Sequence, residues 1–521
     1  MVRTRFAPSP TGLLHIGGVR TALFNYLFAK QNQGSFILRL EDTDRERFVA
    51  EGVDQIVAGL DWVGLRPDEG FWITEGKPHS IDYIQSERHK SGIYQKYADQ
   101  LIEKGLAYRS YISADGYEKY KDRSIKKGVP FIYRKTYEAE YHHKPRQTLY
   151  GDWPIRLDIE AVKGYFSEKK HPFLHERVDW DDEVRGAFSD DLSLMEDFII
   201  IKSDGFPTYN FANVIDDHFM KISHIIRGDE FISSTGKHAL LYEIFGWQSP
   251  KFVHLPVING LDGKKLSKRT GDTDVLDYKE KGYLPEALVN FLALLGWNDG
   301  TEQEIFKHDE LVQKFKLDQI NTSPAVFDPK RLDWMNGYYI RSLSVEELYK
   351  RAADFWTAKA ETATDSYKKR VLSLVQERLK FLAELATLTI FFFEAPSAAT
   401  VRNFYKNPVD KQLIKNTPDL RHFLSATVEQ LKDSDFSHAD IQNRLNKLLK
   451  KLGTKPAILF PVIRIALTGS SVSPEIFGTI EVLGRNESLK RLDAALTALN
   501  QGAWFFMYIS HLFGKFTDHN R

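Results

Sequence analysis

The chain has 521 residues, which is long enough for several hydrophobic cores, and we expect about three to five modules. Its 71 lysines and arginines balance its 71 aspartates and glutamates, so net charge alone predicts no nucleic-acid partner, although positive charge can gather on one face. The absence of cysteine excludes disulfides and thiolate zinc sites.

No apolar run approaches the roughly 20 residues of a membrane span. The first residues contain no apolar signal-like core and begin directly with a β-prone run. We therefore expect a cytoplasmic protein that does not associate with membranes.

The first 40 residues have the pattern strand, turn, helix, strand. Residues 2–6 are β-prone, residues 7–12 form a turn rich in proline and glycine, and residues 36–40 predict a second strand. We expect Gly34 to end the intervening helix. The apolar face of that helix is predicted by residues at spacings of three and four: Val19, Ala22, Leu23, Tyr26 and Leu27. This is the first unit of a dinucleotide-type fold, and its helix N-terminus suits phosphate.

A further helix is predicted at residues 94–102 and closed by Gly105. From Tyr108 to about Pro172, lysines and arginines alternate with tyrosines. This composition suits a surface that stacks bases and follows a nucleic-acid backbone, and it equally suits a solvated, charge-balanced insertion. Composition alone does not choose between these interpretations.

The middle of the chain returns to strands. Residues 198–201 predict a buried strand, and Tyr209 and Asn213 would share one face if their segment is helical. Ile225 and Ile226 indicate a central strand with Arg227 at its carboxyl end, where such sheets bind ligands. Arg5 lies at the corresponding end of the first strand, although a surface arginine is the simpler interpretation.

A lysine-rich turn, residues 264–269, follows a strand-like segment at residues 252–258. Residues 285–295 predict a helix that ends before Gly296, and Trp334 and Met335 are core candidates. Beyond about residue 340 the pattern is helical, with breaks at Pro396, at residues 407–408 and at residues 453–456. The apolar stretch 503–513 predicts a packing helix or a partner contact.

Two separated strings carry a family resemblance. PSPTGLLHIGG (residues 8–18) resembles the HIGH-type signature of class I aminoacyl-tRNA synthetases, and KLSKR (residues 265–269) resembles their KMSKS signature. The strings RFAPSPTG and RLEDTDRER resemble the glutamyl-tRNA synthetase family, of the bacterial or organellar type. Gly18, where the class signature has a second histidine, and Arg269 depart from the wider consensus.

The resemblance implies an α/β fold in which a Rossmann-type parallel-sheet catalytic domain is split by an insertion and followed by an all-α anticodon-binding region. The expected boundaries are 1–107 and 195–260 for the halves of the catalytic domain, 108–194 for an insertion that binds the tRNA acceptor end, 261–340 for the KMSKS-type loop and a stem-contact connector, and 341–521 for the helical region.

The implied activity is ATP-dependent attachment of L-glutamate to the 3′ end of tRNA(Glu) through a glutamyl-adenylate. Two alternatives are a glutaminyl-tRNA synthetase and a non-catalytic tRNA-binding paralogue. Whether tRNA(Gln) is also charged depends on anticodon contacts that the sequence does not locate. The implied partners are tRNA(Glu), glutamate and ATP, and we expect a monomer.

By resemblance, Arg5 pairs with the side-chain carboxylate of glutamate, Arg227 with its α-carboxylate, and Glu41 with its amino group. An arginine fork suits a carboxylate because it can donate two parallel hydrogen bonds. The full glutamate-binding set is Arg5, Ala7, Ser9, Glu41, Tyr209, Asn213 and Arg227. Asp216, Asp217 and Asp229 are left without a role.

The resemblance also assigns an ATP site at the helix mouth, where a lone histidine would otherwise be a turn residue. Its expected members are Ser9, His15, Gly17, Gly18, Glu230 and Lys268, and the expected catalytic residues are His15, Lys265, Ser267 and Lys268. Mg²⁺ would arrive with ATP, held mostly by phosphates and water. We expect no zinc, because there is no cysteine and the pair His142 and His143 supplies too few ligands.

Overall fold

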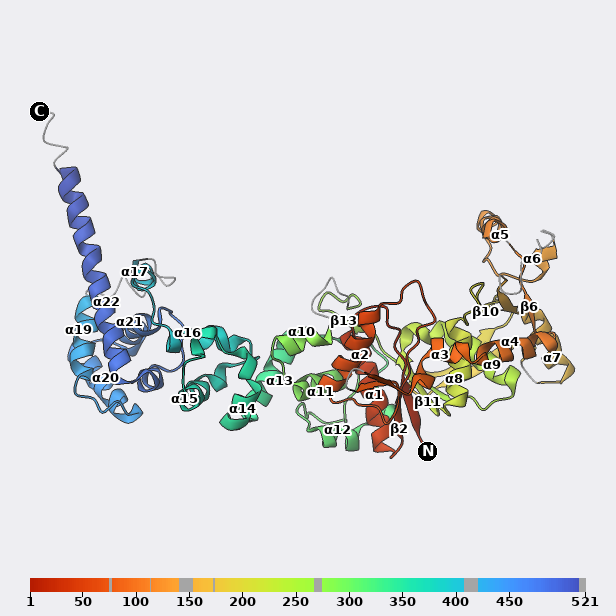
Figure 1. The fold of residues 1–521 in the computed structure, drawn as a ribbon, viewed down its shortest axis with the longest axis horizontal. Helices are drawn as coiled ribbons and strands as arrows, with labels where there is room; N and C mark the ends of the chain where they lie inside the picture. The colour runs from red at the N-terminus through yellow and green to blue at the C-terminus, as the bar shows by residue number, and fades with distance from the viewer. Residues whose placement is uncertain are drawn as a thin grey trace, which may run out of the picture. The chain divides into compact units, whose positions relative to one another are not determined.

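The computed structural model describes residues 1–74, 77–112, 114–139, 153–171, 174–266, 274–406 and 420–514 (Figure 1). Contacts along the chain divide it into two compact units. The first comprises Met1–Lys279 and Pro285–Leu332, and the second comprises Glu280–Leu284 and the residues from Asp333 onward.

The first unit begins with the predicted strand, helix and strand. Strand β1 (Arg3–Phe6) pairs in parallel with β2 (Ser35–Leu38), and β2 pairs in parallel with β3 (Glu69–Gly70). Helix α1 (Ile16–Gln31) connects the first two strands, and α2 (Ala50–Trp62) connects the next two. The predicted apolar face of α1 is confirmed, because four of its five members are fully buried: Val19, Ala22, Leu23 and Leu27.

The end of α1 differs from the expectation. The helix ends at Gln31, and Gln33, with φ of 51°, takes the left-handed conformation that a glycine often supplies there. Gly34 donates its N–H to the carbonyl of Ala29 at 2.8 Å. A Cβ at Gly34 would lie 2.1 Å from the carbonyl oxygen of Val2, so glycine is required by the close approach of the two chain segments.

The second half of the parallel sheet is built from residues far along the chain. Strand β11 (His224–Gly228) pairs in parallel with β12 (Lys251–Leu255), which pairs with β8 (Arg177–Asp182). Strand β8 also forms an antiparallel hairpin with β9 (Gly186–Asp191), although both strands fall in the range 108–194 expected for the insertion.

The two halves of the sheet meet where β1 lies beside β11. The backbone N–H of Ser223 donates to the carbonyl of Arg3 at 2.9 Å, and the Asn25 amide on α1 donates to the carbonyl of Ile226 at 3.0 Å. The carboxyl ends of β1 and β11 are thereby neighbours, as at the switch point of a doubly wound sheet. The expected Rossmann-type parallel sheet is confirmed.

A separate antiparallel sheet has the order β10-β7-β6, and Figure 1 labels β10 and β6. Its strands are β6 (Ala107–Arg109), β7 (Ile155–Leu157) and β10 (Ile199–Ile201), and the helices of this region are α5 (Ala114–Lys126), α6 (Thr136–Ala139) and α7 (Ile159–Glu168).

Some of the tyrosines of this region pack inward. Tyr133 is fully buried with the Arg156 guanidinium 4.0 Å from its ring, and Tyr120 is buried against Tyr137 with ring centroids 4.5 Å apart. Two of the rings that the interleaved pattern offered for base stacking are therefore core residues. Tyr141, Lys144 and Arg146 of the same pattern lie outside the described residues.

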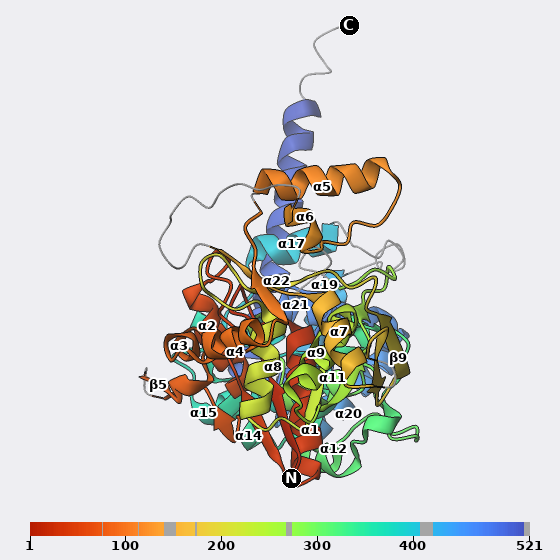
Figure 2. The same cartoon turned by 90° about the vertical axis from the view of Figure 1, so that its right-hand side faces the viewer.

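Helices α8 (Tyr209–Phe219) and α9 (Ile232–Phe245) belong to the same unit and pack side by side (Figures 1 and 2). The other elements of this unit are β4 (Trp72–Thr74), β5 (Lys77–His79), α3 (Gln85–Lys90), α4 (Ile93–Glu103), β13 (Ile258–Asn259), α10 (Val275–Glu280), α11 (Pro285–Ala293), α12 (His308–Lys314) and β14 (Ala325–Val326), with short 3₁₀ turns at Ile81–Tyr83, Asp229–Phe231 and Leu317–Gln319.

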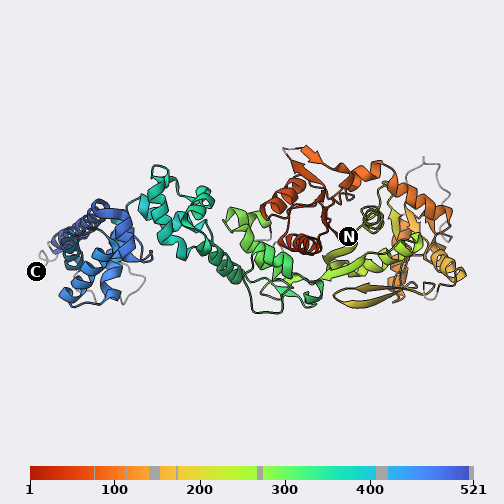
Figure 3. The same cartoon turned by 90° about the horizontal axis from the view of Figure 1, so that it is seen from below.

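In its described residues the second unit contains helices and no strand (Figure 3). The α helices are α13 (Pro329–Ser342), which begins in the first unit, α14 (Val345–Arg351), α15 (Asp365–Val375), α16 (Glu384–Phe393), α17 (Ala398–Lys406), α19 (Leu420–Leu431), α20 (His438–Leu452), α21 (Pro456–Thr468) and α22 (Ile476–Gly514), and 3₁₀ turns lie at Ala353–Phe355, Ala358–Ala360 and Gln376–Arg378. The expected all-α region is confirmed.

Within this unit, α22 is kinked at Gly484, where φ is 77°, and it continues through residues 503–513, whose side chains lie outside the described part. On α13, Met335 is fully buried as expected, whereas the expectation for Trp334 is wrong, because its side chain is 46% exposed. None of the described helices combines the length and apolar character needed to cross a bilayer.

We predict that Gly34→Ala destabilises the first unit by about 1–3 kcal/mol, because the added methyl group forces the backbone away from Val2. Gly164→Ala, on α7, is the matched control. A Cβ there meets nothing within 4 Å, so this substitution should be neutral or stabilise by about 0.5–1 kcal/mol. Urea unfolding of both variants measures the difference, and equal stabilities would show that the close approach at Gly34 is unimportant.

Candidate active site

A cavity of about 970 Å³ opens at the carboxyl ends of β1 and β11. It is lined by every residue predicted for glutamate binding and by all the described residues predicted for ATP: Arg5, Ala7, Ser9, His15, Gly17, Gly18, Glu41, Tyr209, Asn213, Arg227 and Glu230. The fold thus brings together side chains that lie more than 200 positions apart in the sequence.

A second cavity, of about 420 Å³, shares His15, Gly17, Gly18 and Glu230 with the first and is also lined by Lys265. Lys265 is held near the helix mouth by a backbone turn, in which Gly260 donates to the carbonyl of Lys264 at 2.9 Å. Ser267, Lys268 and Arg269 lie outside the described residues.

His15 caps the N-terminus of α1. Its Nδ1 accepts the backbone N–H of Gly17 at 3.0 Å, and its carbonyl accepts from Gly18 at 2.8 Å and from Val19 at 3.1 Å. Because Nδ1 is an acceptor, a neutral ring carries its proton on Nε2. The helix mouth therefore combines the positive end of a helix dipole with an imidazole donor, a combination suited to phosphate oxygens.

Arg5, from β1, is 3% exposed and is held by α8. Its Nε donates to both oxygens of Asp217, at 3.1 and 3.3 Å, and its Nη2 lies 3.4 Å from Oδ1 of Asn213. The Asp217 carboxylate, which the sequence left without a role, is thus a direct partner of Arg5.

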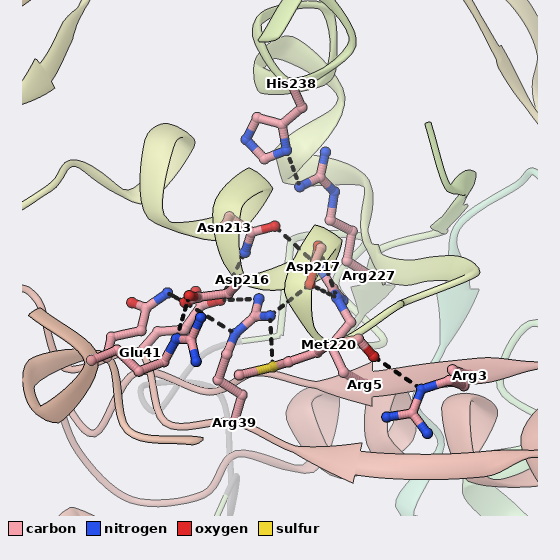
Figure 4. A network of polar contacts seen from close by, with 12 residues as sticks. Arg3, Arg5, Arg39, Glu41, Asn213, Asp216, Asp217, Met220, Arg227 and His238 are labelled. Carbon is pink, nitrogen blue, oxygen red and sulfur yellow. Dashed lines mark hydrogen bonds and ion pairs between the residues drawn. The ribbon is translucent and has the colours of Figure 1, made fainter. Parts of the chain in front are cut away.

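Arg39 is the central residue that sequence reasoning missed. It is fully buried just beyond β2 and donates to Asp217 at 2.6 Å and to Glu41 at 2.8 Å, with Asp216 at 3.9 Å (Figure 4). Burial disfavours the charged guanidinium, yet Asp217, Glu41 and Asp216 outweigh it and hold the pKa of Arg39 well above its ordinary value. The sequence did offer one signal for Arg39, its position two residues before Glu41. Side chains two residues apart in an extended segment lie on the same side.

Glu41 faces the cavity with one oxygen already engaged. Its Oε1 accepts from Arg39 and from the amide of Asn213, at 2.8 and 2.7 Å. Burial raises the pKa of Glu41 although the neighbouring Arg39 and Arg5 oppose the shift. A cationic ligand group, such as an ammonium, would stabilise its charged form.

Arg227, at the end of β11, differs from Arg5 and Arg39 in its partners. Its guanidinium donates to Thr235 Oγ1 at 2.8 Å, Tyr209 Oη at 3.0 Å and His254 Nε2 at 3.1 Å. His238 lies 3.4 Å away (Figure 4), and burial together with Arg227 lowers the pKa of this imidazole well below its usual value. Among the described residues no carboxylate lies within ion-pair distance of Arg227, which is 4% exposed.

Asp216 has a structural position behind the cavity. Its carboxylate accepts from Arg88 at 2.7 Å, Gln85 at 2.8 Å and Tyr94 at 2.9 Å, which fastens α3 and α4 to α8. Among the described residues, no group of three histidine, aspartate or glutamate side chains stands in a metal-binding arrangement.

A parallel sheet, a helix N-terminus at its switch point and a polar cavity between its two halves are consistent with a nucleotide-using enzyme. Residues 1–334 match the family model of the catalytic domain of class I tRNA synthetases (E and Q), and residues 347–496 match that of an anticodon binding domain. The first unit therefore has the catalytic domain of a class I tRNA synthetase.

Similarity to individual proteins extends over almost the whole chain. A glutamate–tRNA ligase of Chloroherpeton thalassium is 40% identical and covers 96% of this chain and 98% of its own, and one of Finegoldia magna is 38% identical and covers 95% and 99%. The solved structure of a glutamate tRNA ligase from Elizabethkingia meningosepticum, in complex with its amino acid, aligns with a TM-score of 0.80 and 31% identity over 95% of this chain and 99% of its own. The chain belongs to the glutamate–tRNA ligase family.

We predict that Asp217→Asn destabilises the protein by about 3–5 kcal/mol at neutral pH, because it leaves two buried guanidiniums without their shared anion. Burial alone would raise the pKa of Asp217, but Arg39 and Arg5 outweigh it, so the folded-state pKa is lowered. The stabilisation is therefore fully present above the unfolded-state pKa of about 3.9 and is lost as pH falls through the folded-state value.

Urea unfolding at several pH values tests this prediction. The gap between wild type and Asp217→Asn should be constant near neutrality and shrink below about pH 4. Glu87→Gln, which removes an exposed ion pair with Lys90, is the control and should change stability far less. A neutral-pH gap no larger than that of the control would contradict the assigned role of Asp217.

Proposed function

We propose that the protein is an ATP-dependent ligase that attaches L-glutamate to the 3′ end of tRNA(Glu) through a glutamyl-adenylate. One observation carries this proposal: a single cavity holds two buried guanidiniums, Arg5 and Arg227, and the buried carboxylate of Glu41, beside a phosphate-suited helix mouth. The names of the nearly full-length relatives support it, and they do not support the glutaminyl alternative.

The proposed substrate arrangement follows the charges of the cavity. The ammonium group pairs with Glu41, the α-carboxylate with Arg227 and the side-chain carboxylate with Arg5, while Ala7, Ser9, Tyr209 and Asn213 line the same space. Glutamine would replace one carboxylate oxygen by an NH₂ group, so that a donor faces the Arg5 guanidinium there, and a site built for a carboxylate rejects such an analogue strongly. This arrangement explains a preference for glutamate.

ATP is proposed to lie across the helix mouth. Its phosphates would accept from Nε2 of His15 at the positive end of the α1 dipole, beside Gly17 and Gly18, while Ser9 and Glu230 line the adjoining cavity. Lys265, Ser267 and Lys268 would stabilise the charge that develops on the α-phosphate and pyrophosphate. Mg²⁺ would bind with ATP and be coordinated mostly by phosphate and water oxygens.

The reaction has two steps. An α-carboxylate oxygen of glutamate attacks the α-phosphorus of ATP and displaces pyrophosphate. A hydroxyl of the terminal ribose of tRNA then attacks the activated carbonyl carbon and displaces AMP. The protein contributes positioning and charge stabilisation, with no covalent enzyme intermediate.

The remaining parts of the chain are assigned to tRNA. We propose that the insertion (108–194) contacts the acceptor end, that residues 261–340 carry the KMSKS-type loop and the stem-contact connector, and that the helical region (341–521) binds the anticodon. The catalytic core is assigned to residues 1–107 and 195–260, to which the β8–β9 hairpin adds two strands. The match of residues 347–496 to an anticodon binding domain supports the assignment of the helical region to the anticodon. We further propose that the protein acts as a monomer in the cytoplasm, without zinc.

Charging assays test the proposed function. Purified tRNA(Glu) and tRNA(Gln) are each incubated with the protein, ATP and either labelled glutamate or labelled glutamine. We expect glutamate to be attached to tRNA(Glu) and glutamine to neither tRNA. Attachment of glutamine in preference to glutamate would overturn the proposal, and the combination of glutamate with tRNA(Gln) shows whether the second tRNA is also charged.

We predict that Lys268→Ala lowers the rate of ATP–pyrophosphate exchange, measured with tRNA present, by about 10²- to 10³-fold. This is the effect of removing one donor to a developing negative charge. The dissociation constant for tRNA should remain within about twofold. Lys264→Ala changes a neighbouring exposed lysine that has no assigned role and is the matched control. An unchanged exchange rate in Lys268→Ala would overturn the assignment of Lys268 to the phosphates of ATP.

A further inference from the structure

The partners of Arg227 form a chain of hydrogen bonds that leads to a carboxylate on another strand. Arg227 and His254 are directly paired positions of the parallel strands β11 and β12, which places both side chains on the same face of the sheet. The Nε of Arg227 lies 3.1 Å from Nε2 of His254, and Nδ1 of His254 lies 2.7 Å from Oδ2 of Asp182. Asp182 and His254 side chains are fully buried.

The direction of these hydrogen bonds is determined by chemistry. An arginine Nε–H can only donate, so Nε2 of His254 accepts and the proton of the ring is on Nδ1, where it is donated to Asp182. Thr235 fits the same order, because its hydroxyl accepts from Arg227 at 2.8 Å and donates to the carbonyl of Phe231 at 3.0 Å. Asp182 therefore determines which tautomer His254 adopts.

Asp182 is itself rigidly placed at the end of β8. Its Oδ1 accepts the backbone N–H groups of Val184 and Arg185, at 2.9 and 2.8 Å, and its Oδ2 also accepts the backbone N–H of His254 at 2.9 Å. All of these contacts need an acceptor. An asparagine amide in this position would have to turn its NH₂ group toward His254 or toward the turn.

We propose that Asp182, acting through His254, is a positioning residue that aims the Arg227 guanidinium at a carboxylate of the amino-acid substrate without neutralising it. This inference rests on the proposed function. A carboxylate in direct contact would compete with the substrate, as Asp217 shares the charge of Arg5. A carboxylate one neutral imidazole away orients the guanidinium and leaves its positive charge for the ligand.

The test compares KM for glutamate, KM for ATP and kcat in the charging reaction. We expect Asp182→Asn and His254→Leu each to raise KM for glutamate by about tenfold or more, the effect of losing a hydrogen bond to a charged group, with KM for ATP within twofold of wild type. His254→Gln, which keeps an acceptor oxygen for Arg227, should be less impaired than His254→Leu. Equal shifts in both KM values, or His254→Gln as impaired as His254→Leu, would overturn the proposal.

A double-mutant cycle separates positioning from a general structural effect. If Asp182 acts through His254, adding Asp182→Asn to His254→Leu should raise KM for glutamate by less than twofold more, whereas fully additive effects would contradict the relay. Asp179→Ala is the control on the same hairpin, because it removes a 2.6 Å hydrogen bond from Ser189 on the exposed side of β8. A rise in KM for glutamate in this control equal to that of Asp182→Asn would also overturn the proposal.

Misfolding of a variant and failure of the proposed function can both be distinguished from failure of the relay. If Asp182→Asn does not fold, as its role in the turn allows, the comparison of His254→Gln with His254→Leu decides. If wild-type protein charges no tRNA with glutamate, the proposed function fails. If it charges glutamate and the His254 variants behave like wild type, the relay alone fails.

Discussion

The Asp217 carboxylate, shared by two buried guanidiniums, is the interaction on which the rest of the site depends. Arg5 comes from β1, Arg39 lies just beyond β2, and Asp217 comes from α8, so one anion joins residues that are 212 and 178 positions away from it in the sequence. Each buried arginine alone would carry a desolvation penalty of several kcal/mol. Asp217 and Glu41 offset this penalty and hold the first and second halves of the catalytic sheet in one geometry.

Arg227 completes this electrostatic arrangement because, unlike Arg5 and Arg39, it has no carboxylate partner among the described residues. Its immediate partners are a hydroxyl, a phenol and two imidazoles whose pKa values are lowered by burial, so they remain neutral. The guanidinium is thus oriented before any ligand arrives while its charge is retained. Such preorganisation means that little reorganisation is needed when a carboxylate binds.

Local signals in the sequence predicted the elements and the residues that line the cavity. Strand–turn–helix patterning located β1 and α1, and the motif resemblance selected Arg5, Glu41, Tyr209, Asn213 and Arg227, all of which line one cavity. The family and the order of the sheet and helical regions followed from the same strings.

What the sequence did not predict depends on contacts between distant segments. Arg39, Asp182 and His254 were missed because their partners lie on other strands or helices, and periodicity carries no information about such pairing. Gly34 was assigned to a helix end because its contact with Val2 is invisible along the chain. The tyrosines of the insertion left an exposed stacking surface open as one of two interpretations, yet Tyr133 is buried.

The points where the chain leaves and rejoins the small sheet determine how this architecture can vary between relatives. The chain leaves the small sheet at Ser110 and returns at Pro154, where a 2.9 Å hydrogen bond from the Ser110 N–H to the Pro154 carbonyl brings the two ends together. The segment between them is therefore a cassette that evolution can lengthen, shorten or exchange without moving the nucleotide sheet. Transplanting the longer range 108–194 would instead remove two strands that complete that sheet.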